Sequence, residues 1–217
     1  MRPPAAVCLR LFAALSLLLS GCGKKAPAAR LTPLPENAVV LLYAAGIGDE
    51  ADFFRSATMD EALSKALKRK VVSMGQAGEF ADNALKRLPD ILQAHDPDLM
   101  ILGYGAMDLW KGTDRATLKA SLSAMIDLAK KQDSQVVMLA LPDLNRLSVK
   151  PDPLFEEVAR EKGVPIENDI IRAVLKDSST KVFRYMVNDK GLEQVAGALR
   201  ALCVTCGGIK DMKSTTH

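Results

Sequence analysis

Three carboxylates beside glycines are the side chains of this 217-residue chain with the widest chemical options. Asp49, Glu79 and Asp108 each come shortly after a segment with the composition of a buried strand. Paired carboxylates can act as general acid and base, or bind a divalent cation. Asp and Glu beside glycine also commonly cap loops and form turns. Because no spacing here fixes a ligand geometry, we favour turn chemistry and expect neither metal nor cofactor.

Ser73 is the candidate nucleophile closest to these carboxylates, and a serine hydroxyl needs a base beside it. The chain has two histidines, His95 and His217. His95 precedes Pro97, where the next strand opens, which places it at the opposite end of the sheet from any site. His217 ends the C-terminal tail. No histidine is therefore expected to activate Ser73.

Cys203 and Cys206 form a Cys-x-x-Cys pair, which can be a redox motif or half of a metal site. The two histidines do not complete a zinc set. Reactive pairs stand at helix N-termini, where the dipole lowers the thiol pKa, whereas this pair follows a predicted helix. We expect a small structural disulfide, with a redox role as the alternative.

Apolar runs alternate with amphipathic stretches along most of the chain. We predict strands at residues 38–45, 70–73, 99–104, 135–141 and 164–166. We predict helices at residues 52–69, 80–94, 113–131, 153–162, 170–175 and 190–202. Strands separated by helices imply right-handed crossovers and a parallel sheet covered on both faces. The prediction is an α/β protein, a three-layer α/β/α sandwich whose ligands bind beyond the carboxyl ends of the strands.

Four short segments follow these strands or precede the last helix: VLLYAAGIG at 40–48, SMGQAGE at 73–79, LGYGAMD at 102–108 and FRYMVNDKG at 183–191. In order and spacing they resemble the four signature blocks of SGNH (GDSL) hydrolases, especially the arylesterase and thioesterase/lysophospholipase branch. The intervening segments LKRLPDIL at 85–92, PDLMI at 97–101, LSAMID at 122–127 and GVP at 163–165 also fall where that family has similar residues. The resemblance implies an SGNH fold with a flavodoxin-like sheet.

The resemblance assigns five site positions, and four of them carry unreactive residues. The family serine corresponds to Gly46, the oxyanion-hole glycine to Gly78 and the oxyanion asparagine to Met107. Asn188 and Gly191 fix the register of the last block, so Phe183 and Met186 take the aspartate and histidine positions, and neither moves a proton. If the alignment is shifted so that Gly48-Asp49-Glu50 takes the place of the family's Gly-Asp-Ser, the nucleophile position holds glutamate and not serine.

The resemblance therefore implies a catalytically inactive protein that binds an envelope ligand or partner. The alternative is an ester or thioester hydrolase working through displaced residues such as Ser73, Asp49 or Glu79. Further polar residues expected near the pocket are Tyr104, Asp108 and Asn188. The replacements make the pocket apolar, which suits an acyl chain or a hydrophobic partner segment. Tyr104 and Trp110 can stack on a glycan or a lipid, although packing is the simpler interpretation.

The N-terminus predicts export and anchoring. Arg2 and Arg10, an apolar run and the sequence LSGC form a signal peptide over residues 1–21 that resembles those of bacterial lipoproteins, with lipid on Cys22. Residues 22–36 are expected to be a tether, 37–206 the hydrolase-like domain and 207–217 a disordered tail. The formal charge of +3 includes two leader arginines, which argues against a nucleic-acid partner. The expected location is the cell envelope, lipid-anchored to a membrane.

Overall fold

The computed structural model describes residues 29–45, 59–143, 149–183 and 186–210. These residues form a five-stranded sheet in the order β2-β1-β3-β4-β5, and every neighbouring pair is parallel. The strands are β1 (Val39–Ala44), β2 (Lys70–Ser73), β3 (Leu99–Gly103), β4 (Gln135–Leu139) and β5 (Ile166–Glu167). The predicted α/β class and parallel sheet are confirmed.

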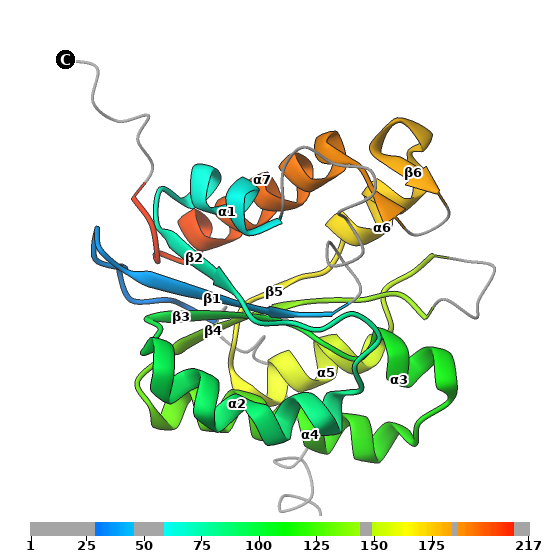
Figure 1. The fold of residues 1–217 in the computed structure, drawn as a ribbon, viewed down its shortest axis with the longest axis horizontal. Helices are drawn as coiled ribbons and strands as arrows, with labels where there is room; N and C mark the ends of the chain where they lie inside the picture. The colour runs from blue at the N-terminus through cyan, green and yellow to red at the C-terminus, as the bar shows by residue number, and fades with distance from the viewer. Residues whose placement is uncertain (1–28, 46–58, 144–148, 184–185, 211–217) are drawn as a thin grey trace, which may run out of the picture.

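Two helical layers cover the sheet (Figure 1). One face carries α1 (Met59–Leu67), α6 (Ile170–Lys176) and α7 (Asp189–Thr205), and the other carries α2 (Ala81–His95), α4 (Arg115–Lys131) and α5 (Pro153–Lys162). Each helix buries one apolar stripe; on α4 the stripe consists of Leu118, Leu122, Met125, Ile126 and Ala129. The three-layer sandwich follows from strands that are apolar on both faces and helices that are apolar on one.

The central strands owe their position to uninterrupted apolar runs. All five residues of β3 are buried, and β1 is buried from Val40 to Ala44. The register pairs Leu42 of β1 with Ile101 of β3 and Ala44 with Gly103. Because all strands run in one direction, their carboxyl ends lie together at one edge of the sheet, which we call the carboxyl edge.

Several short elements were not predicted. They are α3 (Ala106–Lys111), the 3-10 turn η2 (Ser178–Thr180), and the antiparallel hairpin of β6 (Lys181–Phe183) with β7 (Met186–Val187). The predicted helix over 52–69 is present as α1 from Met59, and residues 52–58 lie outside the described residues. Among the described residues, no helix combines the length and apolar character needed to cross a membrane.

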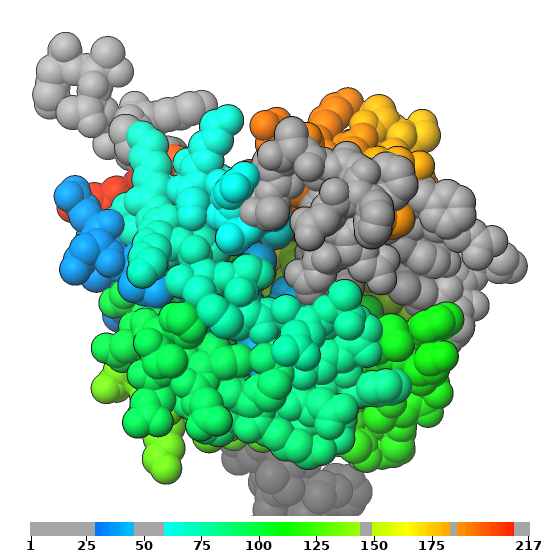
Figure 2. All heavy atoms as spheres, in the orientation of Figure 1, coloured from blue at the N-terminus to red at the C-terminus, as the bar shows by residue number. Residues whose placement is uncertain are grey.

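The folded domain extends beyond the predicted limits of 37 and 206. Leu31 and Leu34 are buried, and their N–H groups donate to the carbonyl oxygens of Cys206 and Gly208 at 2.8 Å each. The two chain segments lie side by side in the space-filling view, blue beside red (Figure 2). Because Leu31 and Leu34 pack into the core, residues 31–36 belong to the folded domain and are not a free tether. Gly208 accepts the hydrogen bond from Leu34, so it also belongs to the domain and not to a free tail.

The predicted disulfide is absent: Cys203 and Cys206 are free thiols at the C-terminal end of α7. Cys203 is fully buried in the core, whereas Cys206 is half-buried. Burial raises the pKa of the Cys203 thiol to about 12 and also raises that of Cys206. Such thiols are poor nucleophiles near neutral pH, which argues against the redox alternative.

Candidate functional site

The carboxyl edge of the sheet holds most of the predicted site positions. The turn after β2 contains Gly78, and α3, which contains Met107, begins soon after β3. Figure 1 shows α3 and the β6–β7 hairpin at the same end of the molecule. The structure therefore places these three elements at the edge where the parallel strands end.

Glycines shape the turn after β2, which we call the Gly78 turn and define as Met74–Glu79. A Cβ atom added at Gly75 would lie 1.6 Å from the carbonyl oxygen of Ala44, so the turn rests directly on the end of β1. Gly78 has a φ of +73°, a left-handed conformation that favours glycine, and it is exposed. Within the described chain the N–H of Gly78 donates no hydrogen bond. The N–H of Gly78 is therefore not committed to a partner within the described residues.

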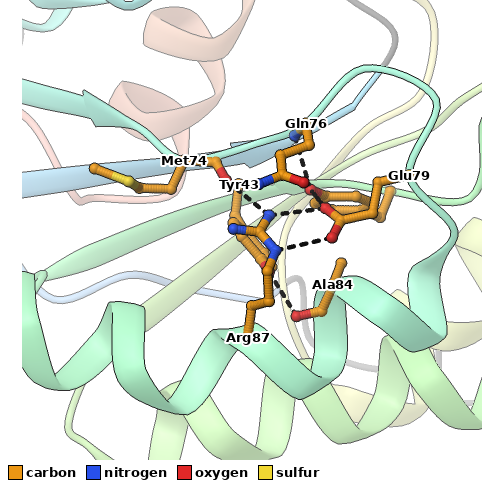
Figure 3. Close-up of polar contacts among 7 residues, drawn as sticks. Tyr43, Met74, Gln76, Glu79, Ala84 and Arg87 are labelled. Carbon is orange, nitrogen blue, oxygen red and sulfur yellow. Dashed lines mark hydrogen bonds and ion pairs between the residues drawn. The ribbon is translucent and has the colours of Figure 1, made fainter.

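A polar cluster beneath the turn fixes its shape (Figure 3). Arg87 from α2 donates to both carboxylate oxygens of Glu79, at 2.8 Å each, and to the carbonyl of Met74 at 3.1 Å. The hydroxyl of Tyr104 donates to Glu79 at 2.6 Å and accepts from the N–H of Gln76 at 3.2 Å. We call these three side chains, Arg87, Glu79 and Tyr104, the Glu79 cluster.

Burial would favour the neutral form of Glu79, yet the hydrogen bonds from Arg87 and Tyr104 outweigh it and lower the Glu79 pKa. Hydrogen bonding to Glu79 in turn raises the pKa of Arg87. Burial raises the pKa of Tyr104, and the bond that its hydroxyl donates to Glu79 raises it further. Near neutral pH the cluster is therefore an ion pair joined to a neutral phenol.

Tyr43 packs against this cluster without touching the turn. Its ring centroid lies 4.8 Å from that of Tyr104, in a tilted arrangement, and Arg87 lies 5.9 Å above its ring. Its hydroxyl donates to the carbonyl of Ala84 in α2 at 2.6 Å. Burial raises the pKa of Tyr43 to about 12. Tyr43 thus ties β1 to α2, whereas Tyr104 ties β3 to the Gly78 turn.

Asp108 and Asn188 both cap helices. The buried carboxylate of Asp108 accepts from the N–H of Ala81 at 2.9 Å, at the start of α2, where Phe80 supplies no side-chain cap. Burial raises the pKa of Asp108, and this N–H bond opposes the rise. Asn188 accepts from the N–H of Gly191 at 3.0 Å at the start of α7. Asp108 thus serves the capping role expected from the sequence, and Asn188, expected near the pocket, caps α7.

Tight backbone contact holds the last sequence block in place. A Cβ atom at Gly191 would lie 2.3 Å from the carbonyl oxygen of Thr180, and the N–H of Asn188 donates to that same oxygen at 3.0 Å. The β6–β7 hairpin pairs Phe183 with Met186 just before this point. These contacts fix the backbone at Asn188 and Gly191, the two residues that set the register of the block.

Met107 and Met186, which the resemblance assigns to the family's asparagine and histidine positions, have side chains that cannot transfer a proton. Met107 and Met186 are half-buried thioethers, and Ser73 ends β2 opposite Leu42. Glu79, predicted as an alternative base, is occupied by Arg87 and Tyr104. Gly46 and Asp49, the predicted lipidation residue Cys22, and the side chain of Phe183 lie outside the described part of the chain.

A cavity in the described part of the chain lies between two helices, away from the Gly78 turn and α3. A groove of about 650 Å³ runs between α1 and α7, with Ala62 and Ala196 among its lining residues and Glu61 and Glu193 among its charged ones. The described residues contain no group of three or more His, Cys, Asp or Glu side chains able to hold a metal ion. Trp110 on α3 is 47% exposed, with Lys111 Nζ 4.1 Å from its ring centroid.

Sequence reasoning did not single out Arg87, which braces the Gly78 turn, or Tyr43, which ties β1 to α2. The LKRLP segment carried a signal for Arg87, because Arg87 falls on the half-buried side of α2 whereas its neighbour Lys86 is exposed. Eight residues separate Glu79 from Arg87, so no helical spacing reveals their pairing. Tyr104 was predicted as a pocket residue, but it is fully buried behind the turn.

The fold and the turn define the class: a three-layer α/β/α sandwich with a glycine turn at the carboxyl edge. Residues 43–202 match the GDSL-like Lipase/Acylhydrolase family, and the chain belongs to that family. An arylesterase from Vibrio mimicus is 35% identical over 71 residues, which is 33% of this chain and 36% of that protein. The match thus spans about a third of the length of this relative.

Solved structures support the fold. TesA superposes with a TM-score of 0.64 at 20% identity, covering 76% of this chain and 99% of TesA. The esterase EstA from Pseudoalteromonas sp., inhibited by monoethylphosphonate, gives 0.64 at 14% identity, covering 78% and 98%. The lipase/acylhydrolase from Enterococcus faecalis gives 0.62 at 16% identity, covering 80% and 99%. At these identities the likeness establishes the SGNH fold.

Proposed function

We propose that this chain is a non-hydrolysing, lipid-anchored member of the GDSL family that binds an acyl ligand in the cell envelope. The proposal rests on Met107 and Met186, which the sequence resemblance assigns to the positions of the family's oxyanion asparagine and histidine. A thioether neither donates a hydrogen bond nor moves a proton. Losing one oxyanion donor alone costs about 10²- to 10³-fold in rate. Hydrolysis is therefore not the retained activity.

Methionine at these positions favours binding of an apolar group. Its flexible thioether chain adapts to irregular apolar shapes, and both residues are half-buried at the carboxyl edge. The N–H of Gly78 remains as a polar contact for a carboxylate or carbonyl oxygen. Two thioether side chains and a backbone N–H without a partner among the described residues would suit the alkyl chain and the carboxylate of a fatty acyl group.

The anchoring part of the proposal rests on the leader and Cys22. A lipid on Cys22 would hold the domain near membrane lipids, a source of acyl ligands. Growth of producing bacteria with a clickable palmitate analogue should label the protein, and Cys22→Ser should abolish the label. Equal labelling of both proteins would refute attachment at this residue.

The second candidate is an ester hydrolase using displaced residues, and the similarity to the Vibrio mimicus arylesterase favours it. It requires Ser73 to react without a histidine. Labelling of the purified protein by a fluorophosphonate probe, lost in Ser73→Ala, would establish this candidate. Absence of labelling, beside a labelled active family member, would exclude it.

Binding can be followed through Trp110, the chain's single tryptophan, which lies three residues after Met107. Titration of the purified protein with dodecanoate should give a saturable fluorescence change. Met107→Asp and Met186→Lys should each weaken binding by about tenfold or more, because they place a charge in an apolar site. Gln132→Lys, at the exposed far end of α4, is the control and should leave binding unchanged. Absence of saturable binding, or equal weakening by all three changes, would sink the proposal.

A further inference from the structure

The Gly78 turn is fixed from below at three of its six residues. Arg87 binds the carbonyl of Met74 and the side chain of Glu79, and Tyr104 binds the N–H of Gln76. Gly75 between them rests on Ala44. Gly78 itself makes no such contact, so its orientation is set by these neighbours.

The donor and acceptor directions of its hydrogen bonds make Tyr104 the link between the Glu79–Arg87 ion pair and the backbone of the turn. An ionised carboxylate can only accept, so the Tyr104 hydroxyl must point its proton toward Glu79, 2.6 Å away. Its lone pairs are then left for the N–H of Gln76. Arg87 holds Glu79 in this charge state through two parallel bonds. One phenol therefore couples the ion pair to the backbone of the turn.

We propose that Tyr104 is a positioning residue, which, through Glu79 and Arg87, holds the Gly78 turn so that its N–H binds the carboxylate oxygen of an acyl ligand. The ligand part rests on the proposed function above. Tyr104 is fully buried, so it acts through the turn and does not touch the ligand. A turn fixed before binding loses less conformational entropy when the ligand arrives.

The chain supplies a matched control in Tyr43. Both tyrosines are fully buried, and their rings pack against each other. Tyr104→Phe removes the hydroxyl that holds the turn, whereas Tyr43→Phe removes one that binds Ala84 in α2. A general effect of losing a buried hydroxyl should appear in both variants, and an effect on the turn only in the first.

The first measurement does not depend on any ligand. Hydrogen–deuterium exchange of the purified wild-type protein and both variants should show faster exchange of the Gln76 amide in Tyr104→Phe alone, by about fivefold or more for the loss of one hydrogen bond. Unchanged exchange in Tyr104→Phe, or equal acceleration in Tyr43→Phe, would overturn the positioning role.

The second measurement uses two probes, dodecanoate and dodecanol, which share an alkyl chain and differ in the carboxylate. Tyr104→Phe should weaken dodecanoate about five- to tenfold and leave dodecanol within twofold, while Tyr43→Phe changes neither. Equal weakening of both probes would indicate a general packing defect and overturn the proposal. If wild-type protein binds neither probe, the proposed function and the ligand role both fail, while the exchange result still decides whether Tyr104 fixes the turn.

Discussion

The Gly78 turn and the β6–β7 hairpin flank the same edge of the sheet but are held in different ways. Buried polar side chains brace the turn, with Arg87 and Tyr104 reaching it from α2 and from beyond β3. The hairpin has two register pairs and is fixed at its end by the cap at Asn188. Neither set of contacts uses a group that would react with substrate. Within the described part of the chain, the contacts that hold the two elements therefore involve no side chain at the five positions that the resemblance assigned to the site.

Steric contact should give the largest effect in both regions. Gly75→Ala and Gly191→Ala would each place a Cβ atom inside contact distance of a backbone oxygen, at Ala44 and Thr180 respectively. We expect the free energy of unfolding to fall by about 3 kcal/mol or more, from urea denaturation. The control Gly197→Ala, on the exposed face of α7 with nothing within 4 Å, should instead raise it by about 0.5–1 kcal/mol. Similar stability of all three variants would contradict the close contacts.

Removing the cation that pairs with Glu79 should cost more stability than removing the cation of an ordinary surface pair. Arg87→Met leaves the nearly buried Glu79 carboxylate without its cation, and we expect a loss of about 2–3 kcal/mol in the free energy of unfolding. The neighbouring Lys86 pairs with Asp82 on the surface, so Lys86→Met should cost less than about 0.5 kcal/mol. Equal losses would show that the Glu79 cluster is no stronger than a surface pair.

Acid should weaken the turn through Glu79. Because the folded-state pKa of Glu79 lies below its ordinary 4.5, its ionised form contributes stability above that pH, and this contribution is lost as pH falls through the lower folded value. Wild-type protein should therefore lose stability below about pH 4.5 more steeply than Glu79→Gln, as followed by thermal unfolding across pH. Parallel curves for the two proteins would contradict the ionised cluster.

The far end of α7 provides a smaller test, away from the site. Cys203 is buried and its thiol pKa is raised to about 12, whereas Cys206 is half-buried. Iodoacetamide at neutral pH should therefore modify Cys206 slowly and leave Cys203 intact, as read by peptide mass spectrometry. A mass two hydrogens lower in protein purified without reductant would instead show that the originally expected disulfide forms.

The sequence predicted the elements whose signals are local. The helix Pro153–Lys162 was predicted with its observed bounds, because Asp152 caps its start and Gly163 ends it in a left-handed conformation. The strands β1, β3 and β4 were predicted to within two residues, because long apolar runs mark central strands. The hairpin and α3 were missed, because elements of two to six residues depend on tertiary contacts and carry no periodicity.

The candidate site divides in the same way. Asp108 was expected to serve turn chemistry and it caps a helix, whereas Asn188, expected near the pocket, was not predicted as the cap that it forms. Arg87 was not predicted, because its pairing with Glu79 exists only once the turn folds back over α2. The docking of Leu31 was missed because the surrounding residues, rich in proline and alanine, have the composition of a tether.

The central claim is that the family's frame remains while its hydrolytic chemistry is absent. The most direct test is the rate at which the purified protein hydrolyses p-nitrophenyl acetate and p-nitrophenyl dodecanoate, beside an active GDSL esterase. We expect rates equal to those of buffer alone for both esters. Turnover above buffer that stays with the protein through repeated purification would contradict the account.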